Sequence, residues 1–148
     1  MDAQAFWNVI GSYNQSTWIM QIALVLLIGA STIIAYKGKY IWLPKLILGI
    51  TNLFIGVVFF LYYGTEPIQY FFAFPLYICV GLLLIWECYN HKDSSFHHFN
   101  IVQCILLFLV IFYPFVSIML GHSFPQMVTN IMPCPVISIS IINHFQFA

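Results

Sequence analysis

The chain has 148 residues, of which 62% are hydrophobic and only 5% are charged. A soluble globular domain has about a quarter of its residues charged, so an ordinary soluble fold is excluded. The formal net charge is zero, which leaves no basic surface for nucleic acid. We therefore expect an integral membrane protein that has the lipid bilayer as its partner and does not bind nucleic acid.

Four long apolar stretches predict four membrane-spanning helices, because about 20 residues at about 1.5 Å each cross a hydrocarbon core of about 30 Å. These spans are expected at residues 17–36, 41–63, 68–88 and 101–121. Before the first span, Phe6, Trp7, Ile10 and Tyr13 recur at helical spacing among polar residues. This pattern predicts a separate short helix lying at the membrane interface, ending near Trp18.

The last stretch, residues 124–148, contains three prolines and is less regular. Met132-Pro133-Cys134-Pro135 cannot continue an uninterrupted helix, because each proline lacks an amide hydrogen and restricts the residue before it. We expect a broken, partial or re-entrant fifth element there. The predicted fold class is all-α: a polytopic transmembrane helical bundle with four full spans plus this fifth element, in a single integral-membrane domain over residues 1–148.

One polar stripe runs along the second predicted span. Lys45, Gly49, Asn52 and Gly56 are spaced by four, three and four positions, which places them on one helix face. An amide in hydrocarbon needs a partner and glycines allow close helix contact, so this face must meet other protein or a polar cavity. The stem of Lys45 is expected to reach the headgroups, and Glu87 is expected to stay solvated at the interface.

Proline 114 lies deep inside the fourth predicted span. It frees the carbonyl of Val110 from its intrahelical hydrogen bond and predicts a kink. Tyr113 and Ser117 could satisfy or exploit this opening. The candidate binding residues are therefore Lys45, Asn52, Ser117 and Cys134.

Cys134 supports two interpretations. It is a small apolar filler at the proline bend, or a soft-metal ligand together with Met132 and Met127, since thiolate and thioether groups suit ions such as Cu(I). We favour the filler, because apolar surroundings raise the pKa of a thiol and leave little thiolate. The histidines at 91, 97 and 98 are interpreted as part of a solvated loop. No catalytic motif is present, so neither an enzyme activity nor a cofactor is predicted.

Several short stretches are similar to an uncharacterised, domain-of-unknown-function family of small multi-pass bacterial membrane proteins. They are Phe6-Trp7, Tyr13-Asn14, Trp18, Gln21, residues 45–52, residues 72–76, Gly81-Leu82-Leu83 and Met132-Pro133-Cys134-Pro135. The resemblance implies an inner-membrane protein of about six helices, with no established activity or ligand. This chain departs from the family pattern at Val136, where the family has a threonine.

Three functional hypotheses follow. The first is a transporter of small solutes or ions, or a channel subunit, because broken helices often surround transport sites. The second is a non-catalytic membrane assembly or accessory protein that acts with copies of itself or with a membrane-protein partner, because packing faces are abundant. The third is the soft-metal site at Cys134.

The distribution of lysines predicts the topology. Lys37, Lys39 and Lys92 lie in two loops on one side, which the positive-inside rule places in the cytoplasm, with the amino terminus and the Glu66 turn outside. Labelling of single cysteines introduced into these loops should therefore modify the Glu66 turn, but not the lysine loops, from outside the cell. External labelling of both lysine loops would contradict this orientation.

Overall fold

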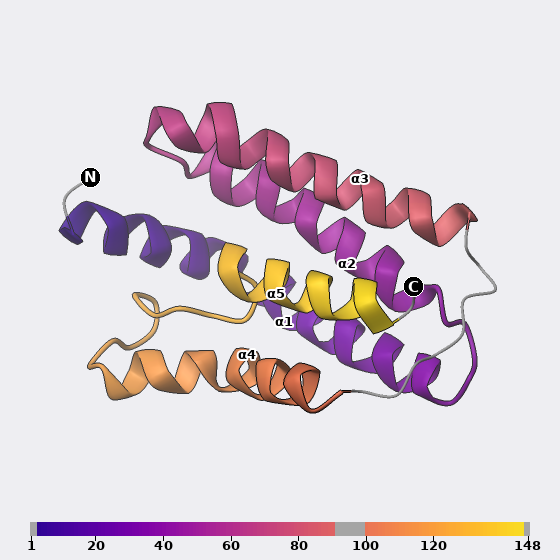
Figure 1. The fold of residues 1–148 in the computed structure, drawn as a ribbon. Helices are drawn as coiled ribbons and strands as arrows, with labels where there is room; N and C mark the ends of the chain where they lie inside the picture. The colour runs from indigo at the N-terminus through magenta and orange to yellow at the C-terminus, as the bar shows by residue number, and fades with distance from the viewer. Residues whose placement is uncertain (1–2, 91–99, 147–148) are drawn as a thin grey trace.

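The computed structural model describes residues 3–90 and 100–146, and every regular element in these residues is helical (Figure 1). The elements are α1 (Ala3–Tyr36), α2 (Leu43–Phe54), the π-helical segments η1 (Ile55–Tyr62) and η2 (Gln69–Ala73), α3 (Phe74–Asn90), α4 (Ile101–Met119) and α5 (Pro133–Gln146). Segment η1 continues α2, and η2 leads directly into α3. The polar segment with His91, His97 and His98 lies outside the described residues.

Within the described residues, four helices are long and apolar enough to cross a membrane: α1, α2 with η1, η2 with α3, and α4. The all-α prediction with four spans is confirmed, and the architecture indicates a membrane-embedded protein. The fifth helix, α5, has 14 residues. At about 1.5 Å per residue it covers only about 21 Å, which is less than a hydrocarbon core. It is the predicted partial element.

The structure corrects two details of the predicted elements. The amino-terminal residues do not form a separate interfacial helix but the first turns of the 34-residue α1, because nothing between Ala3 and Tyr36 breaks the helix. Pro133 and Pro135 do not interrupt a helix either. They lie in the first turn of α5, where the missing amide hydrogens would have no intrahelical acceptor and proline is well tolerated.

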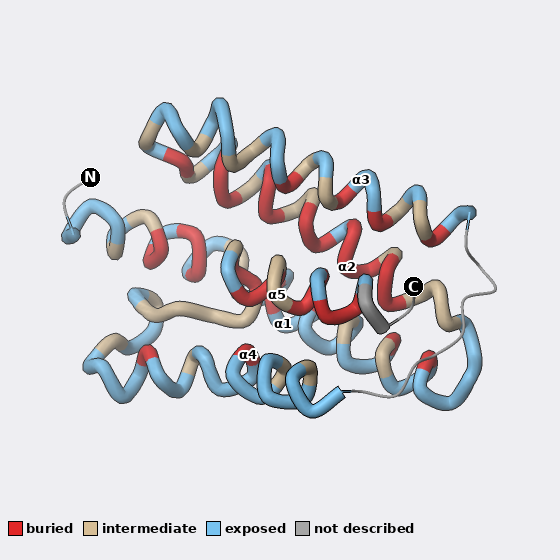
Figure 2. The backbone as a smooth tube through the Cα atoms, in the orientation of Figure 1, coloured by how far each residue is buried: buried red, intermediate tan, exposed pale blue. Residues whose placement is uncertain are grey.

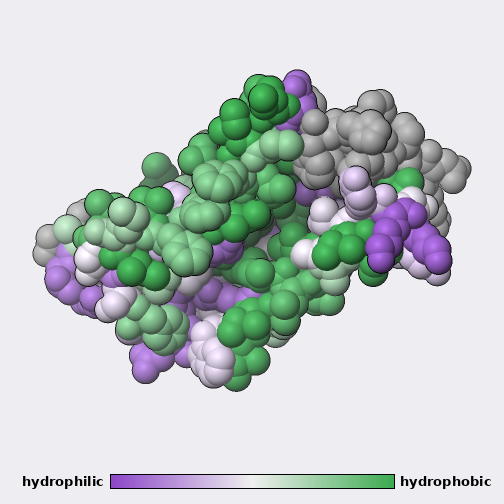
Figure 3. All heavy atoms as spheres, turned by 90° about the horizontal axis from the view of Figure 1, so that it is seen from below, coloured by the Kyte–Doolittle hydropathy of each residue, from purple (hydrophilic) through white to green (hydrophobic). Residues whose placement is uncertain are grey.

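Helix α2 lies at the centre of the bundle. It packs against α1, α3 and α5, whereas α4 contacts mainly α5. Half of the apolar window of the second span is buried inside the protein, but only 11% of that of α4. Figure 2 shows the same difference, with buried residues concentrated on α2 and α4 almost entirely exposed. Figure 3, seen from below, shows mostly hydrophobic residues over this face, with hydrophilic ones toward its ends and in the hollow between.

The polar stripe on α2 faces protein, as its residue types require. Gly49 and Gly81 bring α2 and α3 into close contact: a Cβ atom on Gly49 would lie 2.7 Å from Cγ1 of Ile85 and 3.0 Å from the carbonyl oxygen of Gly81. Asn52 is fully buried and donates from Nδ2 to Oγ of Ser140 on α5, at 2.8 Å. The stripe thus joins α2 to two neighbouring helices.

Substitution of Gly49 by valine should therefore destabilise the bundle. The new side chain would collide with α3 backbone, and such overpacking costs about 1–3 kcal/mol. Gly29→Val is the matched control, because a Cβ atom at Gly29 meets nothing within 4 Å. Unfolding of the purified variants in detergent measures both effects, and equal stability of the two variants would contradict the close α2–α3 contact.

Candidate functional site

An irregular segment, residues 120–132, returns the chain from the end of α4 to the start of α5. Figure 1 shows that α5 begins beside the middle of α1, so this segment enters the bundle to mid-depth. Backbone polar groups at such a depth cannot face lipid and need partners from protein or from a water-filled cavity. The segment is therefore the place in the described chain where side-chain hydrogen bonds are most needed.

Side chains of α1 and α3 supply many of these hydrogen bonds. Nδ2 of the fully buried Asn14 donates to the carbonyl oxygens of Pro125 and Met127, both at 2.7 Å. The hydroxyl of Tyr13 donates to the carbonyl of Ile131 at 2.9 Å. From α3, the hydroxyl of Tyr77 donates to the carbonyl of Pro133 at 2.7 Å. These bonds attach the segment to the core of the bundle.

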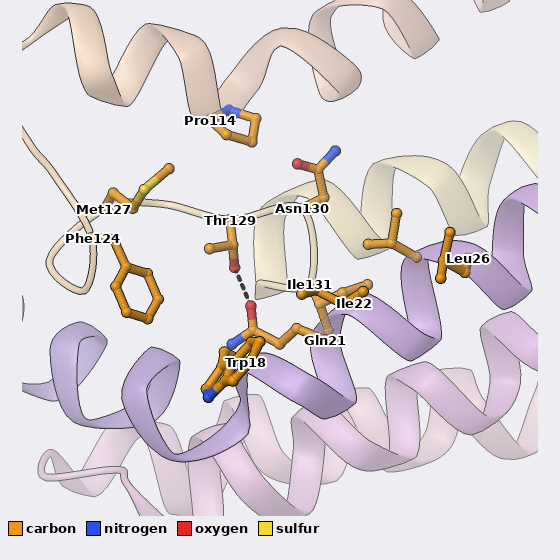
Figure 4. A pocket seen from close by; sticks show the side chains of 11 residues that line it. Trp18, Gln21, Ile22, Leu26, Pro114, Phe124, Met127, Thr129, Asn130 and Ile131 are labelled. Carbon is orange, nitrogen blue, oxygen red and sulfur yellow. Dashed lines mark hydrogen bonds between the residues drawn. The ribbon is translucent and has the colours of Figure 1, made fainter.

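Gln21 extends this network along α1. Its Nε2 donates to Oδ1 of Asn14 at 3.1 Å and to Oγ1 of Thr17 at 2.9 Å. Its Oε1 accepts a hydrogen bond from Oγ1 of Thr129 at 2.7 Å, drawn as the dashed line in Figure 4. Both the nitrogen and the oxygen of the Gln21 amide are thus hydrogen-bonded, which fixes the orientation of this side chain between α1 and the irregular segment.

The irregular segment also bonds to the carbonyl group that Pro114 leaves without an intrahelical partner. Nδ2 of Asn130 lies 3.4 Å from the carbonyl oxygen of Val110, the group that proline frees in α4. Oγ of Ser117 accepts a hydrogen bond from the backbone amide of Val128 at 3.1 Å. The predicted freed carbonyl is therefore satisfied by Asn130 rather than by Tyr113 or Ser117, and Ser117 anchors the segment instead.

Two neighbouring apolar cavities lie where this segment holds α4 away from α1. The main cavity has a volume of about 700 Å³ and is lined by Trp18, Gln21, Ile22, Val25, Leu26, Pro114, Phe124, Met127, Thr129, Asn130 and Ile131. Figure 4 shows α4 with Pro114 on one side and α1 with Trp18, Ile22 and Leu26 on the other. The inner cavity, about 340 Å³, lies between α1, α4 and α5. Val25, Asn130 and Ile131 line both cavities.

Polar groups in these cavities are few. Asn130 lines both cavities, and its Nδ2 donates a hydrogen bond to the carbonyl oxygen of Val110. Asn143 on α5 lines the inner cavity, donates to the carbonyl of Ile139 at 3.2 Å, and keeps a buried Oδ1 that has no hydrogen-bond partner among the described residues. The cavities therefore suit a mostly apolar occupant.

The four residues predicted to bind a ligand do not form one site. None of Lys45, Asn52, Ser117 and Cys134 lines either apolar cavity. Lys45 and Asn52 are buried on α2, and Ser117 bonds the irregular segment. The structure thus gives three of these residues packing contacts within the protein.

The sequence predicted that Lys45 reaches the headgroups. In the structure, Lys45 instead forms an ion pair inside the bundle. Its Nζ lies 3.1 Å from Oε2 of Glu87, and only 4% of the lysine side chain is exposed. Nδ1 of His144 lies 3.1 Å from Oε1 of the same carboxylate. Glu87 is therefore not a freely solvated carboxylate: it joins α2, α3 and α5 at one end of the bundle.

Cys134 is exposed in the first turn of α5, between the two prolines. Of its two proposed partners, Met132 is packed in the core and Met127 lines the main cavity. Within residues 3–90 and 100–146, no group of three His, Cys, Asp or Glu side chains could hold a metal ion.

Sequence reasoning did not identify Asn14, Gln21 and Thr129 as parts of one network, nor Asn130 as the partner of the Val110 carbonyl. Gln21 carried the clearest signal, because it is an amide inside an apolar span and needs a partner there. Its partner could not be named, since Thr129 lies 108 positions away.

The fold and the site define a polytopic α-helical membrane protein with an apolar cavity built on an inserted irregular segment. Over residues 3–147 the chain matches a family of unknown function (DUF6064), and it belongs to that family. The resemblance to an uncharacterised family is thereby confirmed. No curated protein and no solved structure shows a significant match, so function is argued from the geometry.

Replacement of Asn14 by leucine should release the irregular segment. Two inserted carbonyl groups would lose their donor, and each unsatisfied buried group costs about 1–3 kcal/mol. We expect lower thermal stability and faster amide exchange over residues 125–131. Gln4→Leu is the control, because Gln4 is an exposed amide on the same helix that donates its hydrogen bond to Asn8 and not to the irregular segment. Unchanged exchange in Asn14→Leu would show that the amide does not hold the segment.

Proposed function

We propose that this protein binds a lipid-class molecule in the main cavity, between α1, α4 and the segment before α5. The observation that supports the proposal most strongly is the cavity itself. Its volume of about 700 Å³ is within the range of about 300–1,000 Å³ typical of ligand sites, which are largely apolar with a few fixed polar groups. A site with these properties inside a membrane-spanning bundle favours a ligand that arrives from the bilayer.

The rim of the cavity supports entry from the lipid phase. Ile22 and Leu26 on α1 are 52% and 66% exposed, and both line the main cavity. In a bilayer such exposed apolar side chains face acyl chains. A molecule already dissolved in the bilayer can therefore reach the cavity without crossing water, and it loses little solvation on entry.

Transport of small solutes or ions has weaker support. That hypothesis used Lys45 and Asn52 as polar groups lining a path. Lys45 is paired with Glu87 and Asn52 with Ser140, and both are enclosed by packed helices. Charged and amide groups that serve a solute path are expected to face a water-filled cavity. The lipid-binding proposal requires no such path.

The proposed location is the cell membrane, with the amino terminus outside. Figure 1 shows the α1–α2 loop and the end of α3 at the same end of the bundle. Lys37 and Lys39 lie in that α1–α2 loop, so an excess of positive charge at this end favours the cytoplasmic side. Trp18 then lies toward the outer interface, beside the mouth of the main cavity.

Substitution of Val25 by tryptophan tests the proposal, because Val25 lines both cavities and an indole ring would fill the space. Steric conflict of about 1–3 kcal/mol predicts roughly 5- to 150-fold weaker retention of a bound lipid. Leu27→Trp is the matched control: Leu27 is also exposed on α1 but lines neither cavity.

The measurement combines native mass spectrometry of co-purified lipids with cross-linking by a photoreactive acyl chain. The wild type and Leu27→Trp should retain lipid and label peptides of α1 and α4. Val25→Trp should lose both signals. Equal labelling of all three proteins would contradict a specific site and indicate only the annular lipid that surrounds any membrane protein.

A further inference from the structure

A third cavity, which is polar, borders the main cavity at the amino-terminal part of α1. This polar cavity has a volume of about 330 Å³. One wall is formed by Asn8, Gly11, Ser12 and Gln15 of α1, and the other by residues 123–126 of the irregular segment. Gly11 makes the close approach of these walls feasible, since a Cβ atom there would lie 3.2 Å from Cγ of Gln126.

The polar groups of this cavity are amides and hydroxyls. None of its lining residues is Lys, Arg, His, Asp or Glu. Asn8 accepts a hydrogen bond from Nε2 of Gln126 at 3.2 Å, which joins the two walls at the rim. Ser12 and Gln15 are exposed, and their side chains have no hydrogen-bond partner in the described part of the chain. They offer both donors and acceptors to a ligand.

The nearest histidine along the chain, His122, does not line the polar cavity. Its ring is stacked on Trp7, with ring centroids 3.7 Å apart. An anionic head group is bound best by Arg or Lys, and a quaternary ammonium by carboxylates or aromatic cages. Among the described residues that line this cavity, none offers either kind of charge recognition. Their chemistry matches an uncharged group that both donates and accepts hydrogen bonds.

The polar cavity and the apolar main cavity adjoin each other, as the polar head group and the acyl chain of a lipid do. Phe124 lines both. Along α1, Gln15 lies about 4.5 Å and Asn8 about 15 Å beyond Trp18, at about 1.5 Å per residue. The 34 residues of α1 extend for about 51 Å, well beyond a hydrocarbon core of about 30 Å. The polar cavity can therefore lie at headgroup level while the main cavity lies among the acyl chains.

We propose that the protein selects lipids with an uncharged, hydroxyl-bearing head group, which the polar cavity binds while the acyl chain occupies the main cavity. This inference rests on the proposed lipid-binding function and adds the class of head group. Gln15 and Ser12 are assigned as the residues that bind the head group, and the lining of the main cavity holds the chain.

The test compares three probes with the same acyl chain: monooleoylglycerol, the anionic oleoyl lysophosphatidate, and methyl oleate, whose small ester head has no hydrogen-bond donor. Binding to the full-length protein in nanodiscs is measured by displacement of the photoreactive chain. Monooleoylglycerol should bind the tightest. Gln15→Leu should weaken its binding roughly 2- to 10-fold, the effect expected for one lost hydrogen bond, and should leave methyl oleate unchanged.

Ser16→Leu is the matched control, because Ser16 is exposed next to Gln15 but does not line the polar cavity. It should bind all three probes like the wild type. A second variant, Ser12→Leu, should repeat the selective loss. Both positions are exposed, so the variants should fold, which thermal unfolding verifies.

The outcomes separate the two proposals. If Val25→Trp abolishes binding of all probes but lysophosphatidate competes as well as monooleoylglycerol, lipid binding stands and the head-group inference is wrong. An absence of any effect in both Gln15→Leu and Ser12→Leu overturns the inference in the same way. If no probe displaces the photoreactive chain, or Val25→Trp retains every probe, both proposals are wrong.

Discussion

The structure depends on the requirement that backbone polar groups within a membrane have partners. Regular helices meet it by themselves, but residues 120–132 form no helix and enter the bundle to mid-depth. Carbonyl and amide groups of this segment are bonded by side chains of two helices, Asn14 on α1 and Ser117 on α4, while Tyr77 on α3 donates to the carbonyl of Pro133, where α5 begins. Asn14 and Ser117, polar residues within apolar helices, thus serve to bond the backbone of this segment.

The cavities follow from the same arrangement. Because the inserted segment and α5 lie between α1 and α4, the last spanning helix is held apart from the first and has little contact with the rest of the bundle. Pro114 adds a carbonyl acceptor on α4 that Asn130 of the inserted segment meets. The space that remains is lined by the apolar side chains that a membrane helix carries anyway, so an apolar cavity results without a dedicated set of binding residues.

The opposite side of the bundle is organised by close packing and one ion pair. Glycines allow α2 and α3 to approach each other, as small residues do in many membrane proteins. Lys45, Glu87 and His144 join three helices at one end. A buried ion pair is weak evidence of stabilisation, because desolvation offsets much of the attraction. Any other arrangement of these helices would leave the buried Lys45 without its carboxylate, so the pair favours the observed one.

The sequence by itself determined the class of the protein, the four spans and the fact that the stripe on α2 must face protein, because length, hydropathy and helical spacing are local properties. It also indicated that Pro114 frees the carbonyl of Val110. Only the tertiary structure decided which groups meet these needs. Asn130 and Gln21 find partners on other elements, and Lys45 finds a carboxylate instead of the headgroups. None of the four candidate binding residues lines an apolar cavity. The physical reason is that an apolar wall has no local signature in a membrane protein: the same side chains face lipid, a neighbouring helix or a cavity, and only the packing of the helices distinguishes these environments.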